Sequence, residues 1–137
     1  MTFVAAHSIR ELEAPQEMRK PVVLVVDESD FVIRFVARML EHRGFEIRAA
    51  RTPEEAFAIC RAETVDLVLA EPAPTGREPL GPSSLRAAGV VAPLVLLSAG
   101  RPSPEALEAE FPGADAYFLK PFFAEDLLAS IGELVDG

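Results

Sequence analysis

The sequence predicts an α/β fold in which five parallel strands form one doubly wound sheet with helices on both faces. Three observations lead to this prediction. Short apolar runs recur five times after residue 20, helical segments separate them, and 137 residues suit one domain with one well-buried core. Strands that alternate with helices form parallel β-α-β units, and right-handed crossovers place the helices on both faces of the sheet.

The predicted strands are the five apolar runs. The first, PVVLVV, is continuous and rich in β-branched residues, as expected for a strand that is buried on both faces. The five runs occupy residues 21–26, 45–50, 65–70, 93–97 and 115–120.

The first helix is predicted to begin at Ser29 or Asp30, either of which can cap its N-terminus, and to end at Gly44. Its apolar residues recur at helical spacing: Phe31, Val32, Phe35, Val36, Met39 and Leu40. This spacing predicts an amphipathic helix whose apolar face includes Phe31 and Phe35.

The second helix has a strong start signal, because Thr52 can cap it, Pro53 suits the first position and Glu55 completes a capping box. A serine cap followed by proline predicts another helix over residues 103–111, and spaced Leu, Ile and Val predict the last one over about 123–135.

The segment from residue 71 to 92 is the least regular part of the chain. Pro79 and Pro82 would interrupt any helix between them, so only a short helix over residues 83–89 is predicted there. Residues 1–20 are mostly polar and are interpreted as an N-terminal extension, either a short helix or a disordered segment. Residues 21–137 form the predicted domain.

Composition excludes several classes of protein. A formal net charge of −9 argues against direct binding to nucleic acid or to an anionic membrane, whereas it suits a site that attracts a cation. No apolar run approaches the ~18 residues that span a bilayer. A single cysteine, Cys60, and a start without a secretory signal favour a reducing, cytoplasmic location.

Polar residues follow four of the five predicted strands: Asp27, Glu28, Glu71, Ser98 and Lys120. In doubly wound sheets a site forms outside the carboxyl ends of the strands. Each residue alone has an ordinary explanation, such as a helix-dipole contact, a loop hydroxyl or a surface charge. Because the five positions come from four separate strands, we expect them to form one functional site.

Four motifs carry a resemblance to a known family: VVDE at 25–28, DLVLAE at 66–71, PLVLLSA at 93–99 and GADAYFLKPF at 113–122. They resemble the receiver domain of two-component response regulators over about residues 21–136. The resemblance implies a flavodoxin-like (βα)5 fold with strand order 2-1-3-4-5. It also implies a role in bacterial phosphorelay signalling, with a histidine kinase or a downstream effector as partner.

The resemblance also implies roles for single residues. The acidic pair Asp27 and Glu28 would help to hold Mg²⁺, and Ser98 and Lys120 would contact a phosphoryl group on the acceptor at the end of the third strand. The ring of Tyr117 would change rotamer as the partner surface switches. With Mg²⁺ and an ammonium offsetting the charge, positioning and electrostatics would do most of the catalysis.

The acceptor position departs from the family, because it holds Glu71 where the family has aspartate. The side chain is longer by one C–C bond, roughly 1.5 Å, which should spoil the nucleophile and weaken one Mg²⁺ ligand. Pro72 removes a backbone N–H from the loop, and Thr75 stands where the family usually has proline. We therefore predict a pseudo-receiver that is not phosphorylated in the usual way, with Glu71 as a candidate mimic of the phosphorylated state through Lys120.

The predicted role is protein–protein interaction, not enzymatic turnover, through a face around Tyr117, Phe118, Phe122 and Phe123. A homodimer through the fourth helix, fifth strand and fifth helix is a further arrangement that the resemblance implies. The chain ends one helix after Lys120, so we expect a single-domain regulator or a fragment of a longer protein.

Two alternatives stay open. The first is an ordinary receiver that accepts a phosphoryl group from a histidine kinase on another carboxylate, with Asp27 as the nearby aspartate. The second is a small enzyme or nucleotide binder of the same architecture. No glycine-rich phosphate loop follows the first strand, and neither His7 nor His42 stands beside a nucleophile in the predicted site.

Overall fold

The structure, a computed structural model, describes residues 19–72 and 80–136. Strands and helices alternate along the chain from the first strand to the last helix. They are β1 (Val22–Val26), α2 (Asp30–Glu41), β2 (Glu46–Ala50), α3 (Pro53–Ala62), β3 (Leu67–Ala70), α4 (Pro82–Ala87), β4 (Leu94–Ser98), α5 (Pro104–Glu110), β5 (Ala116–Leu119) and α6 (Ala124–Asp136). The α/β fold predicted from the sequence is confirmed. Residues 1–18 of the predicted extension lie outside the described residues.

The five strands form one parallel sheet in the order β2-β1-β3-β4-β5, as predicted. Strand order reverses between β1 and β3, because β2 lies on one side of β1 and every later strand lies on the other. Val26 pairs with Ala50 on one side and with Ala70 on the other, so the carboxyl ends of these strands are level. This edge is where doubly wound folds place their sites.

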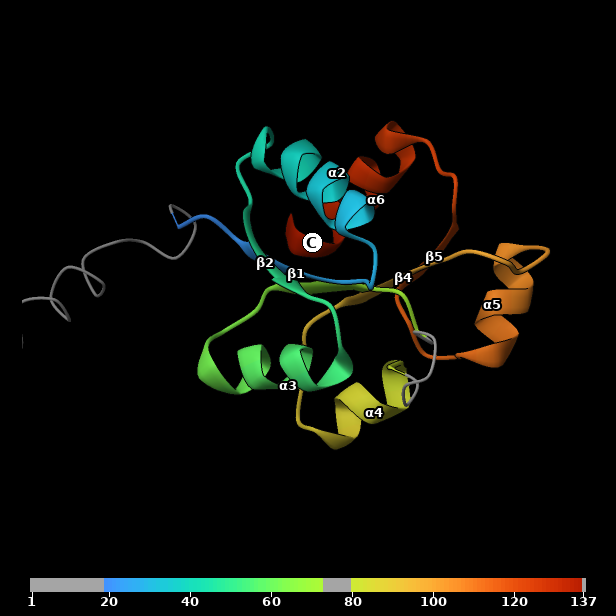
Figure 1. Cartoon of the computed structure of the whole chain (residues 1–137), viewed down its shortest axis with the longest axis horizontal. Helices are drawn as coiled ribbons and strands as arrows, with labels where there is room; N and C mark the ends of the chain where they lie inside the picture. Colours follow the sequence, from blue (N-terminus) through green and yellow to red (C-terminus); the bar gives the residue numbers. More distant parts are fainter. Residues whose placement is uncertain (1–18, 73–79, 137) are drawn as a thin grey trace, which may run out of the picture.

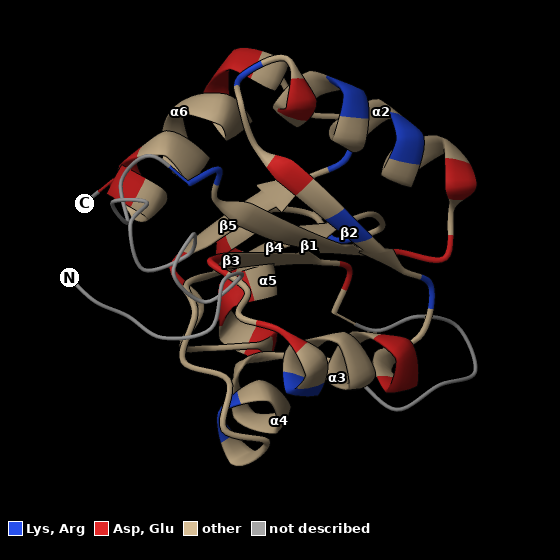
Figure 2. Cartoon of the chain, turned by 90° about the vertical axis from the view of Figure 1, so that its left-hand side faces the viewer, with Lys and Arg blue, Asp and Glu red and all other residues tan. Residues whose placement is uncertain are grey.

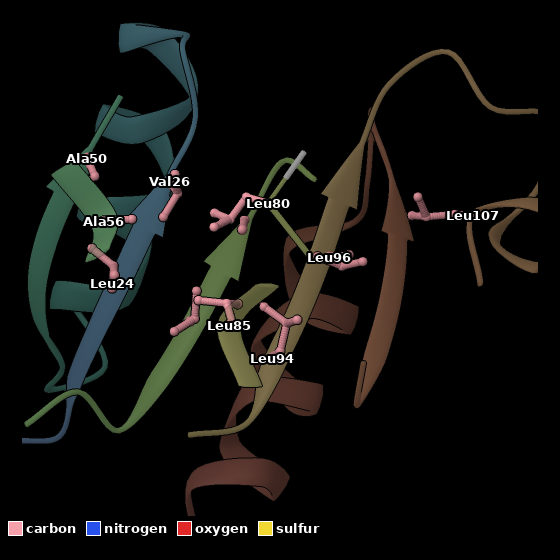
Figure 3. Close-up of a cluster of buried hydrophobic side chains, with 11 residues drawn as sticks. Leu24, Val26, Ala50, Ala56, Leu80, Leu85, Leu94, Leu96 and Leu107 are labelled. Carbon is pink, nitrogen blue, oxygen red and sulfur yellow. The ribbon is translucent and has the colours of Figure 1, made fainter. Parts of the chain in front are cut away.

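Helices cover both faces of the sheet. Helices α2 and α6 lie on one face and α3, α4 and α5 on the other (Figure 1; Figure 2). Alternate strand residues point to opposite faces, so each strand contributes to two hydrophobic clusters. Figure 3 shows the cluster under α3, α4 and α5, to which Leu80, Leu85 and Leu107 contribute from outside the sheet.

Three predicted helix caps are present. Ser29, Thr52 and Ser103 each accept a hydrogen bond, at 3.1–3.2 Å, from the backbone N–H three residues later. The carboxylate of Glu55 accepts from the N–H of Arg51 at 2.8 Å, one residue before the position that a reciprocal capping box would use. Each cap satisfies an N–H that has no partner inside its helix.

One prediction for α2 is wrong. Phe31 and Phe35 are 71% and 47% exposed, whereas Val36 and Leu40 are fully buried. Apolar residues cover more than one face of this helix, and only one face can meet the sheet. The phenylalanines precede Val32 and Val36 by one residue, which turns them by about 100° away from the packed face.

The segment before β4 contains a short helix, as predicted. Helix α4 has six residues and begins at Pro82, whose missing N–H would have no helical partner at this position. Leu85 is fully buried against the sheet. Pro79, which we expected to interrupt this region, lies outside the described residues. Within residues 19–72 and 80–136, no helix has the length and apolarity that crossing a bilayer requires.

Candidate functional site

Backbone hydrogen bonds position the predicted site residues at the carboxyl edge of the sheet. The parallel ladder continues just past the strands, where the N–H of Asp27, of Glu71 and of Lys120 donates to a carbonyl of the neighbouring strand at 2.8–3.0 Å. Ser98 is the last residue of β4 and is fully buried. Four residues from four strands are therefore held by the sheet itself.

The ammonium of Lys120 bridges two carboxylates. Its Nζ lies 2.6 Å from Asp27 Oδ2 and 2.9 Å from Glu71 Oε1. Only 6% of the Asp27 side chain and 15% of the Glu71 side chain are exposed. Burial lowers the pKa of Lys120, but the hydrogen bonds that its ammonium donates to Asp27 and Glu71 outweigh this effect, so the pKa of Lys120 is raised above its ordinary value.

The second oxygen of Glu71 is also engaged. Ser98 donates its hydroxyl proton to Glu71 Oε2 at 2.8 Å. The carboxylate therefore lies between an ammonium on one side and a hydroxyl on the other. The extra carbon of glutamate carries the carboxylate out from β3 to a position where both contacts form.

Arg101 completes the cluster, and the sequence prediction missed it. Its Nη1 donates to Ser98 Oγ at 2.6 Å and lies 3.9 Å from Glu71 Oε2. The guanidinium also pairs with Glu110 at 3.0 Å and lies over the ring of Phe111, 5.7 Å from its centroid. The one sequence signal is an arginine three residues after Ser98, in a loop whose path the strand pattern does not define.

Of the three predicted Mg²⁺ ligands, Asp27 and Glu71 meet at the ammonium of Lys120, and Glu28 does not join them. Both oxygens of Asp27 are engaged, Oδ2 by Lys120 and Oδ1 by the backbone N–H of Ser29 at 2.9 Å. Glu28 is exposed, and no hydrogen bond or ion pair joins it to the cluster. Among the residues that the structure describes, no three His, Cys, Asp or Glu side chains are grouped to hold a metal ion. The side chains in this arrangement therefore do not fit a divalent cation.

Tyr117 points inward from β5. Its hydroxyl donates to the carbonyl of Phe111 at 2.7 Å and accepts from the N–H of Ala114 at 3.0 Å. The half-buried ring packs against the cluster beneath α3, α4 and α5. Phe118, its neighbour, packs on the other face of the sheet, as strand alternation requires.

Exposed aromatic rings lie on another part of the molecule. Phe31 stacks on Phe35 with ring centroids 6.2 Å apart, and Phe35 meets the edge of Phe122 at 6.1 Å. Phe123, next to Phe122, is 79% exposed. These four residues are called the aromatic surface below. It joins α2 to the loop before α6.

A cleft of about 410 Å³ lies at the opposite, amino-terminal edge of the sheet, between the ends of α3 and α4. Cys60 lines it, and burial raises the pKa of the Cys60 thiol. None of the charged residues of the carboxyl-edge cluster contributes to this cleft.

Comparison with known proteins agrees with the fold. The family model of the response regulator receiver domain matches residues 23–132. The transcriptional regulatory protein YvrH of Bacillus subtilis is 30% identical over 115 residues, which cover 83% of this chain and 48% of that protein. The transcriptional regulatory protein KdpE of Mycobacterium tuberculosis is 31% identical over 113 residues, covering 80% and 49%. The chain thus spans about half the length of these relatives.

Solved structures show the same fold. A response regulator from Thermotoga maritima superposes with a TM-score of 0.72 at 30% identity, covering 86% of this chain and 99% of that one. The receiver domain of the Francisella response regulator 1452 superposes with a TM-score of 0.75 at 24% identity, covering 85% and 98%. The chain therefore belongs to the response regulator receiver domain family, whose members act in two-component signalling.

Proposed function

We propose that this receiver domain acts by protein–protein interaction and is not phosphorylated in the usual way. The observation that supports this proposal is the engagement of Glu71. Its two oxygens contact Lys120 at 2.9 Å and Ser98 at 2.8 Å, the two residues that would contact a phosphoryl group in a receiver. The carboxylate thus occupies the contacts that phosphorylation would use.

Two physical requirements of phosphoryl transfer are poorly met. In-line attack needs reacting atoms held about 3–3.5 Å apart, and a 1 Å error can cost ~10²-fold in rate. Receivers typically bind Mg²⁺ beside the acceptor, and Mg²⁺ demands octahedral geometry at about 2.0–2.1 Å. The oxygens of Asp27 and Glu71 are already held by Lys120, Ser98 and the N–H of Ser29.

Family membership supports one alternative, a receiver that accepts a phosphoryl group from a histidine kinase. Asp27 is the aspartate nearest to the cluster, but it is 5% exposed, and Lys120 and a backbone N–H hold its oxygens. Phosphorylation of Asp27 would require this ion pair to open first.

The test is incubation with acetyl phosphate and Mg²⁺, followed by intact mass measurement and peptide mapping. We expect no added phosphoryl group on this chain, because Lys120 and Ser98 already hold both oxygens of Glu71. A receiver domain with aspartate at the acceptor position, treated in parallel, verifies that the donor is active. A phosphoryl group mapped to Glu71 would refute the proposal, and one mapped to Asp27 would favour the alternative.

We propose the aromatic surface as the docking site for a signalling partner, a histidine kinase or a downstream effector. Phe31 and Phe123 expose more than two thirds of their surface, which folding alone does not require. Of the four interface residues predicted from the sequence, Phe122 and Phe123 belong to this surface, whereas Tyr117 and Phe118 are half-buried on opposite faces of the sheet. An interface role for Tyr117 and Phe118, and a homodimer, stay predictions.

A cytoplasmic location is part of the same proposal. Its support is the single cysteine, Cys60, which cannot form a disulfide within the chain and suits a reducing compartment. YvrH and KdpE are transcriptional regulatory proteins. Because this chain spans half of their length, a transcriptional output is not assigned to it.

A further inference from the structure

We infer that Arg101 is a positioning residue that joins the Glu71 cluster to the end of α5 and thereby holds Tyr117 in its inward orientation. Nothing in the four sequence motifs assigns a role to this arginine. The inference rests on the proposed function, because it explains how a site that is not phosphorylated could hold the switch residue in one state.

The first step is the direction of the Ser98 proton. An arginine guanidinium only donates hydrogen bonds, so the contact of 2.6 Å between Arg101 Nη1 and Ser98 Oγ makes the hydroxyl oxygen an acceptor. The single hydroxyl proton is then directed to Glu71 Oε2 at 2.8 Å; the carbonyl of Ala99, at 3.2 Å, is the longer alternative. Arg101, Ser98 and Glu71 thus form one polarised chain of hydrogen bonds.

The second step is the attachment of Arg101 to α5. Glu110, the last residue of this helix, pairs with the guanidinium through Nε at 3.1 Å and Nη2 at 3.0 Å. The guanidinium also lies over the ring of Phe111. With 19% of its side chain exposed, Arg101 is held between β4 and the end of α5. A planar donor with several N–H groups can hold Ser98 and Glu110 at the same time, which a lysine cannot do as well.

The third step leads from Phe111 to Tyr117. The carbonyl of Phe111 accepts the Tyr117 hydroxyl at 2.7 Å. Its ring also lies close to Gly81, where an added Cβ would be 3.0 Å from Phe111 Cδ1. Phe111 is therefore held by Arg101, by Tyr117 and by the start of α4. A shift of Arg101 would change the position of the group to which the Tyr117 hydroxyl is bound.

Charge balance supports the same assignment. Asp27 and Glu71 carry two negative charges, which the positive charges of Lys120 and Arg101 offset, and the half-exposed Glu110 adds a third negative charge on the outer side of Arg101. Arg101 supplies the second positive charge that the four family motifs do not provide. Lys120 and Arg101 thus lie next to the carboxylates that a divalent cation would otherwise neutralise.

The chain allows a direct test, because Tyr117 is its only tyrosine and it has no tryptophan. Tyrosine fluorescence therefore reports on Tyr117 alone, and acrylamide quenching measures its accessibility. We expect Arg101→Ala to raise the quenching constant by about two-fold or more, because the ring leaves its half-buried place. Arg101→Lys and Glu110→Gln should give smaller rises. Glu71→Gln should raise the quenching constant as Arg101→Ala does. Combining Glu71→Gln with Arg101→Ala should raise it little further than either substitution alone.

Arg48→Ala is the matched control, since Arg48 forms ion pairs with Glu46 and Glu63 on the surface, away from the cluster. Circular dichroism verifies that each variant is folded. A quenching constant equal to that of the unsubstituted protein in folded Arg101→Ala and Glu110→Gln would overturn the inference. The phosphodonor assay reports separately on the proposed function. If Glu71 becomes phosphorylated while Arg101→Ala still shows the expected rise in the quenching constant, the proposed function is refuted and the inference about Arg101 stands.

Discussion

At the scale of single residues, the one carbon atom by which Glu71 exceeds an aspartate determines which side chains its carboxylate contacts. Glu71 reaches Lys120 with one oxygen and Ser98 with the other. The ion pair is partly exposed, with 15% and 20% of the two side chains accessible, so its main effect is to fix geometry and not to add much stability. A fixed carboxylate with two partners is a poor nucleophile and a good structural anchor.

The raised pKa of Lys120 predicts a loss of stability at alkaline pH. The folded chain holds the Lys120 proton more tightly than the unfolded chain does. The contribution of the Lys120 ion pairs to the free energy of unfolding is therefore complete below the ordinary pKa of 10.5. It is lost as the pH rises through the higher pKa that Lys120 has in the folded chain. Urea unfolding at pH values on both sides of 10.5 should show a falling free energy of unfolding, and Lys120→Met should show a smaller fall.

Lys20 provides the control for this experiment, since it is the only other lysine and it is exposed. Lys20→Met should keep the alkaline loss of stability. Equal pH dependence in Lys120→Met and in the unsubstituted protein would show that the Lys120 ion pairs do not contribute. At neutral pH, Lys120→Met should cost on the order of 3 kcal/mol, because it leaves two carboxylates without their cation.

Much of the site was predictable from the sequence because strand ends can be recognised. Asp27, Glu71, Ser98 and Lys120 each follow or end a recognisable apolar run, and parallel strands bring those ends together. Arg101 was not predictable, because its contacts depend on the path of a loop and on a long side chain. Glu28 was expected in the cluster, yet it is exposed, since adjacent residues at a strand exit point in different directions.

At the scale of strands and helices, carboxylates also anchor the amino-terminal edge of the sheet. Asp66 accepts a hydrogen bond from the N–H of Val22, and Asp115 accepts one from the N–H of Leu94, both at 2.8 Å. Each carboxylate precedes a strand and satisfies the first N–H of the neighbouring strand. Asp66 and Asp115 therefore have a structural role at the edge opposite the Glu71 cluster.

Within residues 19–72 and 80–136, the predicted strands and helices agree with the structure in number and order, and they differ mainly at their ends. Apolar runs identify the strands because strands buried on both faces have no polar face. The face of α2 that packs on the sheet was not predictable in the same way, because apolar residues occupy more than one face of this helix. Which of them meet the sheet depends on how the helix lies across it.

Two glycine substitutions test the packing between α4 and α5. Gly81 has an extended backbone that alanine tolerates, but a Cβ there would lie 3.0 Å from the ring of Phe111. We expect Gly81→Ala to cost about 1–3 kcal/mol through overpacking. Gly132 in α6 has no atom within 4 Å of an added Cβ, so Gly132→Ala should stabilise by about 0.5–1 kcal/mol.

Urea unfolding of both variants measures these differences, and Gly132→Ala serves as the control for the general effect of replacing glycine. A stabilising Gly81→Ala would show that Phe111 does not lie against the start of α4 in solution. The attachment of Phe111 that the Arg101 inference uses would then lose one of its three contacts.

At the scale of the whole molecule, the net charge of −9 is spread over several elements. Figure 2 shows acidic segments on α3 and α6 and basic ones on α2. A divalent cation is attracted to such a surface without any specific site, and salt screens this attraction. An experiment on Mg²⁺ must therefore distinguish binding at a specific site from the general effect of ionic strength on a negatively charged protein.

We expect Mg²⁺ to leave thermal stability unchanged once ionic strength is matched. A ligand stabilises a protein only when it binds the folded state, by RT ln(1 + [L]/Kd). The melting temperature with millimolar MgCl2 should therefore equal that in NaCl of the same ionic strength. A higher melting temperature that is specific to Mg²⁺ and absent from Asp27→Asn would show that the ion pairs open to admit the cation.

The outer edge of the sheet has a consequence for self-association. Strand β2 has a neighbour on one side only, and it carries Glu46 and Arg48, which pair with each other and, through Arg48, with Glu63 of the loop after α3. Charged side chains on an edge strand oppose pairing with a strand of another molecule. Pairing of β2 with a strand of another copy, and growth of fibrils from this side of the sheet, are thus disfavoured.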